Sequence, residues 1–265
     1  MWQPDGAGWR ARIGVLTPNL DPVPESEFQA MAPEGVSIHA ARVPLGTMGP
    51  DGVIQPLLGP DIARAFAEPP HVDDAVALLS AISLNAIVYA FISSSYLTGP
   101  DADAALIDRL QKRSRGIPIV VCSVATVVGL RRIGAKRLAL IHPPWWSTEL
   151  DKAGVDYLEN QGFEVVHHSI ASLRSGFGEI PPEQIYDFAK AHVPVSADAV
   201  FFGGSGFRSI GVIQALEDDL RRPVMSTNQV AFWYALRRSG VDARVVGYGR
   251  LFEMDLPEDQ AIRGI

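Results

Sequence analysis

The chain has 265 residues, of which 47% are hydrophobic and 20% are charged, and its formal net charge is -7 at pH 7. This acidic balance argues against nucleic acid as the main partner, because phosphate binding needs a basic face, and the single cysteine excludes an internal disulfide framework and a cysteine-rich metal site. No apolar run reaches the length of a membrane span, so the composition predicts a cytoplasmic protein that binds neither nucleic acid nor a membrane.

The first half of the chain contains apolar segments of strand length that alternate with segments of helical spacing. Strands are expected at 12–18, 36–43, 86–91 and 118–122. Helices are expected at about 25–31, 73–84, 100–113 and 125–133. Residues 45–60 are rich in Gly and Pro, which predicts a long loop that could act as a lid.

The second half repeats this order of elements. Its strands are expected at 137–143, 163–167, 199–202 and 223–226. Its helices are expected at 148–161, 182–192, about 210–220 and 230–239. A glycine-containing loop is expected at 169–180, and an irregular tail from residue 241.

Two pairs of strand segments match position for position, namely 12–18 with 137–143 and 85–89 with 198–202. The repeat predicts an α/β fold of two pseudo-symmetric domains, each a parallel four-stranded sheet flanked by helices. The N-terminal domain would comprise residues 12–118 and about 228–265, and the C-terminal domain residues 119–227. A ligand site is expected in the interdomain cleft.

The turn that follows the strand at 199–202 has the most site-like composition in the chain. Three glycines surround Ser205, and Arg208 follows. Glycine permits positive φ or a close approach of a ligand to the backbone, and ligands bind at the carboxyl ends of parallel strands. The repeat pairs this turn with residues 91–95, so the two turns should face each other across the cleft.

Several motifs together carry a family resemblance. They lie at 14–18, 34–36, 129–134, 162–166, 228–229 with Trp233, and 247–252. In their order and spacing, the chain resembles the aspartate/glutamate racemase superfamily, within it the maleate cis-trans isomerase and arylmalonate decarboxylase branch. The resemblance implies a small carboxylate substrate, no cofactor, and chemistry at the α-carbon of the carboxylate.

The resemblance also implies a catalytic cysteine in the turn of each domain. Carried over residue by residue, these positions fall on Phe91 and Gly204. The repeat gives the same pair, because Phe91 lies five residues after Ala86 and Gly204 five residues after Ala199, and it aligns these two alanines. The single thiol, Cys122, ends a predicted strand and is either a core residue or a reactive group. The family's cysteine chemistry is therefore not expected, and covalent addition of a cysteine to maleate is disfavoured.

Hydroxyl, amide and guanidinium groups near the two turns are candidates for binding the substrate. Ser93, Ser94 and Ser95 either cap a helix or form a carboxylate pocket. Arg208 is either a surface residue or a carboxylate clamp. Asn19 and Asn228 complete the predicted substrate-binding set.

Three residues are candidates for the catalytic step. Asp21 and His142 begin matching turns and could move a proton, Asp21 only if burial raises its pKa. Ser205 would be the nearest nucleophile or donor. A turn or capping role explains Asp21 and His142 equally well, and His167, His168 and His192 lack the spacing of a metal site.

These features predict a lyase or isomerase that needs no cofactor and no metal and acts at the α-carbon of a small mono- or dicarboxylic acid. Two other functions stay open. One is a non-catalytic carboxylate-binding protein on the same scaffold, and the other is a different reaction such as cyclic-amide hydrolysis. A homo-oligomer is compatible with the sequence.

Overall fold

Two parallel four-stranded sheets form the two halves of the molecule in a computed structural model that describes residues 3, 5–48, 54–55, 59–174 and 179–257. The first sheet has the order β2-β1-β5-β6 and the second the order β10-β9-β7-β8. The strands are β1 (Ala11–Pro18), β2 (Val36–Val43), β5 (Ala86–Tyr89), β6 (Ile119–Val121), β7 (Arg137–His142), β8 (Glu164–Ile170), β9 (Ala199–Phe202) and β10 (Val224–Ser226). Read from the opposite edge, the second sheet repeats the first strand for strand, so the predicted pseudo-symmetric α/β fold is confirmed.

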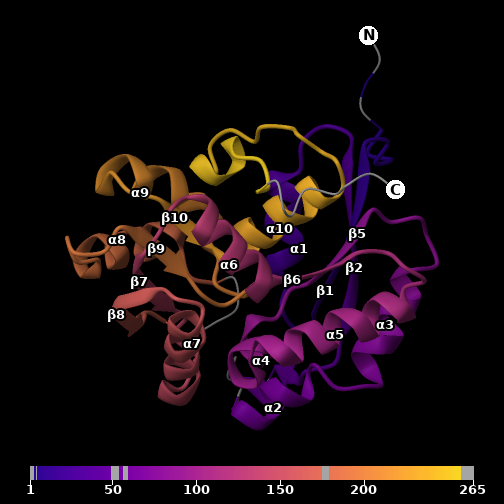
Figure 1. Cartoon of the computed structure of the whole chain (residues 1–265), viewed down its shortest axis with the longest axis horizontal. Helices are drawn as coiled ribbons and strands as arrows, with labels where there is room; N and C mark the ends of the chain where they lie inside the picture. The colour runs from indigo at the N-terminus through magenta and orange to yellow at the C-terminus, as the bar shows by residue number, and fades with distance from the viewer. Residues whose placement is uncertain (1–2, 4, 49–53, 56–58, 175–178, 258–265) are drawn as a thin grey trace.

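Helices cover both sheets because the central strands are apolar on both faces. Every residue of β5 and β9 is buried. The helices are α1 (Val23–Met31), α2 (Pro60–Ala65), α3 (His71–Leu79), α4 (Ile92–Thr98), α5 (Pro100–Arg113), α6 (Cys122–Arg132), α7 (Thr148–Asn160), α8 (Pro182–His192), α9 (Ile213–Leu220) and α10 (Thr227–Arg238), with 3-10 turns η1 (Ile210–Val212) and η2 (Arg250–Glu253). Figure 1 shows the two sheets with their helices as separate lobes.

The structure corrects several expected boundaries. Helix α10 begins three residues before the expected start, because the Ser226 side chain accepts from the Gln229 N–H and forms a capping box. The expected loop at 45–60 contains the short antiparallel pair β3 (Thr47–Met48) and β4 (Ile54–Gln55), and α2 begins at its end. The rest of this loop, and residues 175–178 of the loop expected at 169–180, lie outside the described residues.

The edge strand β6 lies close to the expected domain boundary. Its hydrogen bonds join it to β5, so the strand expected at 118–122 is the fourth strand of the first sheet, although the expected boundary after residue 118 lies just before it. The chain crosses to the other lobe only after β6. Helices α6 and α10, which follow the two edge strands β6 and β10, pack against each other between the lobes (Figure 1).

Helix α10 returns to the first lobe after the second sheet is complete. It packs against α1 and β5, and the rings of Phe28 and Phe232 lie 5.0 Å apart at the α1–α10 contact. These contacts place α10 beside the N-terminal half of the chain as well as beside α6.

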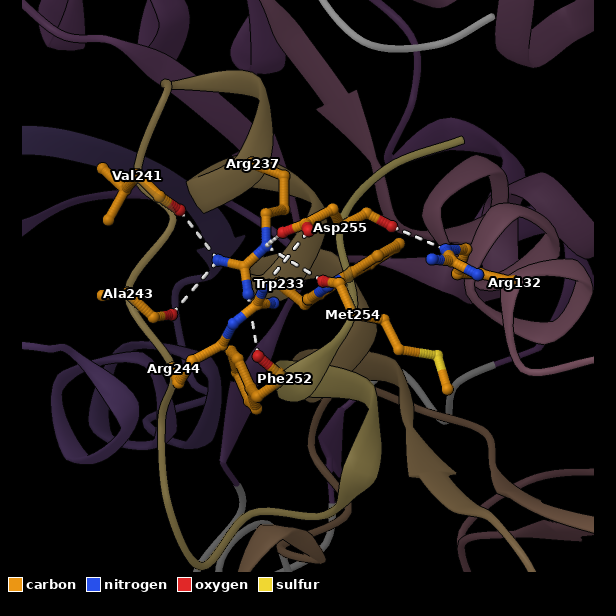
Figure 2. Close-up of polar contacts among 9 residues, drawn as sticks. All are labelled: Arg132, Trp233, Arg237, Val241, Ala243, Arg244, Phe252, Met254 and Asp255. Atoms are coloured by element: carbon orange, nitrogen blue, oxygen red, sulfur yellow. Dashed lines mark hydrogen bonds and ion pairs between the residues drawn. The ribbon is translucent and has the colours of Figure 1, made fainter. Parts of the chain in front are cut away.

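The segment after α10 is held by a buried arginine, as Figure 2 shows. Arg237 donates hydrogen bonds to four main-chain carbonyls at 2.7–3.2 Å, those of Val241, Ala243, Phe252 and Met254. Trp233 Nε1 donates to the Met254 carbonyl as well. Since a guanidinium offers five donors, this one side chain can hold several points of the described tail, in which η2 is the one regular element up to residue 257.

Candidate active site between the two sheets

A small cavity lies where the two sheets meet. Its lining comes from four segments, each of which follows the carboxyl end of one of the four central strands β1, β5, β7 and β9. The lining residues are Asp21, Phe91, Ile92, Ser93, Trp145, Trp146, Gly204, Ser205 and Gly206. The turns of the two halves thus meet as expected, at the place where parallel sheets hold ligands.

The cavity is nearly filled by its own walls. Its volume is ≈ 10 Å³, which is room for about one water molecule. The Phe91 ring packs on Phe66 with centroids 4.1 Å apart. Gly204 has φ +93°, and a Cβ added there would lie 2.9 Å from Pro143 Cγ. One wall therefore consists of an aromatic ring, and the other consists of backbone held against a proline.

Asp21 is a titratable group in the cavity wall. Its side chain is 2% exposed, and its Oδ1 accepts a hydrogen bond of 3.0 Å from the Val23 N–H. Burial raises the pKa of Asp21 to about 7, although the Val23 N–H and the charge of Arg42 favour the carboxylate. Near neutral pH this carboxyl can therefore both donate and accept a proton.

Ser205 presents an unsatisfied hydroxyl at the same cavity. Its Oγ is buried and has no hydrogen-bond partner in the described part of the chain. Asn228 approaches the Ser205 main chain, with its Nδ2 donating to the Ser205 carbonyl at 2.7 Å. Buried polar atoms without partners are rare in native proteins, and here one of them faces a space where a polar ligand could satisfy it.

Of the three consecutive serines, only Ser93 lines the cavity. The expected turn is the beginning of helix α4, in which successive side chains point about 100° apart. Ser94 Oγ lies 2.8 Å from Tyr89 Oη and donates to the Phe91 carbonyl, so it is turned away from the cavity. Ser95 is also buried without lining the cavity.

Two other predicted binding residues lie elsewhere. Asn19 holds the loop after β2, because its amide donates to the Gly46 carbonyl and accepts from the Leu45 N–H, both at 3.0 Å. Arg208 is exposed and lines a separate hollow of ≈ 500 Å³, whose wall also includes Glu27 and Tyr248. The arrangement gives neither residue a contact with the cavity.

His142 lies behind the cavity wall. Its side chain is fully buried, and Nδ1 lies 2.7 Å from Asp151 Oδ1. The other carboxylate oxygen lies 2.7 Å from Nδ1 of half-exposed His168. Sequence reasoning missed this His142–Asp151–His168 chain, although an acidic residue in the first turn of the helix after a strand-end histidine is a signal for it.

The environment of His142 keeps it neutral and tightly enclosed. Burial lowers the pKa of His142 despite its hydrogen bond to Asp151. Burial raises the pKa of Asp151, but the two histidines outweigh this effect and leave the pKa lowered. The ring stacks on Trp146 at 4.3 Å, and a Cβ at Gly203 would lie 2.4 Å from its Cδ2. His142 therefore supports the wall of the cavity from behind.

The thiol of Cys122 belongs to the core. The residue begins α6 and is completely buried, and burial raises the pKa of the Cys122 thiol above its ordinary value. Because the thiolate is the reactive form of cysteine, this environment disfavours the reactive form of Cys122.

Glu27 is a buried acid that sequence reasoning did not select. It lies on α1 in the wall of the ≈ 500 Å³ hollow, with both carboxylate oxygens in hydrogen bonds.

Among the described residues, no group of three or more His, Cys, Asp or Glu is placed to hold a metal ion. In the same part of the chain, no helix has the length and apolar character needed to cross a membrane.

Comparisons with known proteins agree with this architecture. Residues 69–252 match the model of the arylmalonate decarboxylase family. The maleate isomerase of Alcaligenes faecalis is 23% identical over 262 residues, which is 93% of this chain and 98% of that protein. The arylmalonate decarboxylase of Bordetella bronchiseptica is 25% identical over 168 residues, covering 61% of this chain and 68% of that one.

A solved structure has the same fold. It is a cysteine-to-serine mutant of the Nocardia farcinica maleate cis-trans isomerase with a covalently bound succinylcysteine intermediate. The TM-score is 0.79 at 23% identity, and the match covers 92% of this chain and 99% of the other.

Proposed function

The chain belongs to the arylmalonate decarboxylase family, and from this premise we propose that it is a cofactor-independent lyase or isomerase that acts at the α-carbon of a small carboxylic acid. One observation carries the proposal. Asp21, with a pKa raised to about 7, and the unsatisfied hydroxyl of Ser205 line one cavity at the meeting point of the strand ends.

The proposed chemistry uses no cysteine. The positions to which the resemblance assigns cysteines are Phe91 and Gly204, neither of which can form a thioether. The thiol of Cys122 is buried in the core. A covalent adduct such as the succinylcysteine of the Nocardia relative is therefore not part of the proposal for this chain.

Ser93 and Ser205 would hold the substrate carboxylate. Their hydroxyls can donate hydrogen bonds to a carboxylate oxygen, and donors placed in advance stabilise negative charge as a bond at the α-carbon breaks. In a decarboxylation that bond joins the α-carbon to a second carboxylate, which leaves as carbon dioxide. In an isomerisation it joins the α-carbon to a hydrogen, which leaves as a proton. Either reaction leaves an enediolate-like carbanion at the site.

Asp21 would complete either reaction by proton transfer. In a decarboxylation the protonated carboxyl gives its proton to the α-carbon after carbon dioxide has left, and the carboxylate then takes up a proton from water. In an isomerisation the carboxylate first takes the proton from the α-carbon, and the acid so formed returns a proton to the same carbon. A cavity of ≈ 10 Å³ does not hold a substrate, so Phe91, Trp145 or Trp146 must move as the ligand enters.

A panel of acids tests the proposal. The purified chain is incubated in D2O with maleate, 2-substituted malonates, their monocarboxylic products and a cyclic amide, and proton NMR follows each compound. We expect loss of carbon dioxide or deuterium at the α-carbon for at least one acid, and no reaction with Asp21→Asn. Asp108→Asn, an exposed change on α5, should keep full activity and serves as the control.

The same panel distinguishes a second candidate function. The bulk of the Phe91 side chain in the cavity favours a carboxylate-binding protein without catalysis, because the ring takes the space that a reactive group would need. Binding of an acid, seen as a thermal shift, with no exchange at its α-carbon would support this candidate and contradict the proposed enzyme. Hydrolysis of the cyclic amide would contradict both.

A further inference from the structure

Glu27 joins the two lobes through hydrogen bonds. Its side chain is 4% exposed, and α1, on which it lies, packs on the first sheet. Oε1 accepts from the Ile210 N–H at 3.1 Å, and Oε2 accepts from Asn228 Nδ2 at 2.7 Å. One oxygen of Glu27 is thus bound by Ile210 of the opposite lobe and the other by Asn228 of α10. The side chain fixes the positions of η1 and α10 relative to α1.

The second hydrogen of the Asn228 amide reaches the wall of the cavity. An asparagine Nδ2 has two hydrogens, and this one donates to Glu27 and to the Ser205 carbonyl. With both of its oxygens accepting hydrogen bonds, the Glu27 carboxylate determines which way the Asn228 amide faces. The capping box of α10 holds the Asn228 backbone in place, so the amide has little freedom apart from a flip.

We infer that Glu27 is a positioning residue of the cavity, which orients the Asn228 amide so that this amide holds the Ser205 turn beside Asp21. The inference rests on the proposed function only for its effect on catalysis. The placement of the turn is a property of the free protein, and it can be measured without a substrate.

Charge couples Glu27 to Asp21 as well. Burial raises the pKa of Glu27 to about 7, and the charge of Asp21 raises it further, while Asn228 and the N–H groups of Ser209 and Ile210 lower it. The other groups that face this region are Arg42 of β2, which donates to the Asp21 carbonyl, and Arg208 and Tyr248 in the adjoining hollow. The two carboxyls therefore repel each other when both are ionised.

Glu27→Gln tests the inference with almost no change in shape. A glutamine oxygen can accept from one donor, but its amide then faces the other donor, so we expect the Asn228 amide to flip and release the Ser205 carbonyl. In NMR spectra, the Ser205 and Gly206 amide signals should shift. The titration midpoint of the Asp21 carboxyl should fall, because a like charge is removed. Glu34→Gln, an exposed change in the loop after α1, should alter neither.

A double variant separates positioning from simple attachment of the lobes. In Glu27→Gln with Asn228→Asp, donor and acceptor exchange places, so the contact between α1 and α10 is restored while the Ser205 carbonyl has no donor. We expect recovery of the melting temperature without recovery of the Ser205 signals or of activity. This variant also serves if the single one does not fold.

Two results would overturn the inference: unchanged Ser205 signals and Asp21 midpoint in Glu27→Gln, or full recovery of both in the double variant. Neither measurement uses a substrate. A failure of the proposed reaction would therefore leave this test intact.

Discussion

Phe91 and Gly204 line the same cavity, and each stands two residues beyond the end of its strand, β5 or β9. The repeat in the chain thus becomes two equivalent positions facing one space. Their surroundings differ, since the Phe91 ring packs on Phe66 while Gly204 lies against Pro143. Any side chain at 204 would need both a left-handed backbone and a displaced proline.

Gly204→Ala should therefore destabilise the fold more than the same change at a comparable glycine. Gly134 also has positive φ, +76°, but a Cβ there meets no atom within 4 Å. Both changes cost about 1–2 kcal/mol for the left-handed backbone, and the clash with Pro143 should add about 1 kcal/mol or more at position 204. Urea unfolding of the two variants measures the difference, and equal losses would contradict the close approach of Pro143.

Asp21 should make the protein less stable as pH rises from about 4 to 7. Its pKa is about 7 in the fold against an ordinary 3.8, so in this range the unfolded chain has released a proton that the native state still holds. The effect is complete above pH 7 and amounts to about 4 kcal/mol at most. Asp21→Asn should flatten this part of the stability curve, as measured by denaturant unfolding at several pH values. If the unfolding free energy of Asp21→Asn changed with pH as steeply as that of the control Asp108→Asn, the assigned role of Asp21 would be refuted.

Asp151→Asn should leave either buried His142 or half-exposed His168 without its carboxylate acceptor, because an asparagine oxygen can serve one of the two rings but not both. We expect a loss of about 2 kcal/mol at neutral pH. The pKa of Asp151 is lowered in the fold, so its contribution is present above the ordinary carboxyl pKa and disappears as pH falls through the folded pKa. The difference in unfolding free energy between Asp151→Asn and the wild type should therefore decrease as the pH falls.

The control for this variant lies on the same helix. Asp156→Asn removes an exposed ion pair with Lys152 and should change stability by less than about 0.5 kcal/mol. In wild-type protein, nitrogen-15 NMR should show His142 with its proton on Nδ1. A proton on Nε2 instead would contradict the arrangement.

Arg237→Met should loosen the tail that follows α10. The change leaves the carbonyls of Val241, Ala243 and Phe252 without this donor, while the Met254 carbonyl keeps only Trp233. It should cost about 3 kcal/mol or more. Limited proteolysis should then cut between residues 241 and 255 while the rest of the chain resists. Arg238→Met, at the half-buried neighbouring position on the same helix, should leave the tail protected, and early cleavage in both variants would speak against a specific role of Arg237.

The apolar runs and their repetition in the chain determine most of the fold. Buried segments such as Ala86–Tyr89 and Ala199–Phe202 predict central parallel strands, and their order predicts which ends meet. From the same pattern the two turns and Asp21 could be assigned to one cavity. Each of these conclusions depends on residues close together along the chain.

The partners of buried polar groups were decided by the tertiary structure alone. Which serine of α4 faces the cavity depends on where the helix begins. Glu27 forms hydrogen bonds with Ile210 and Asn228, which lie 183 and 201 positions further along the chain. Periodicity reports whether a side chain is buried, but a hydrogen bond depends on which distant group the fold brings to it.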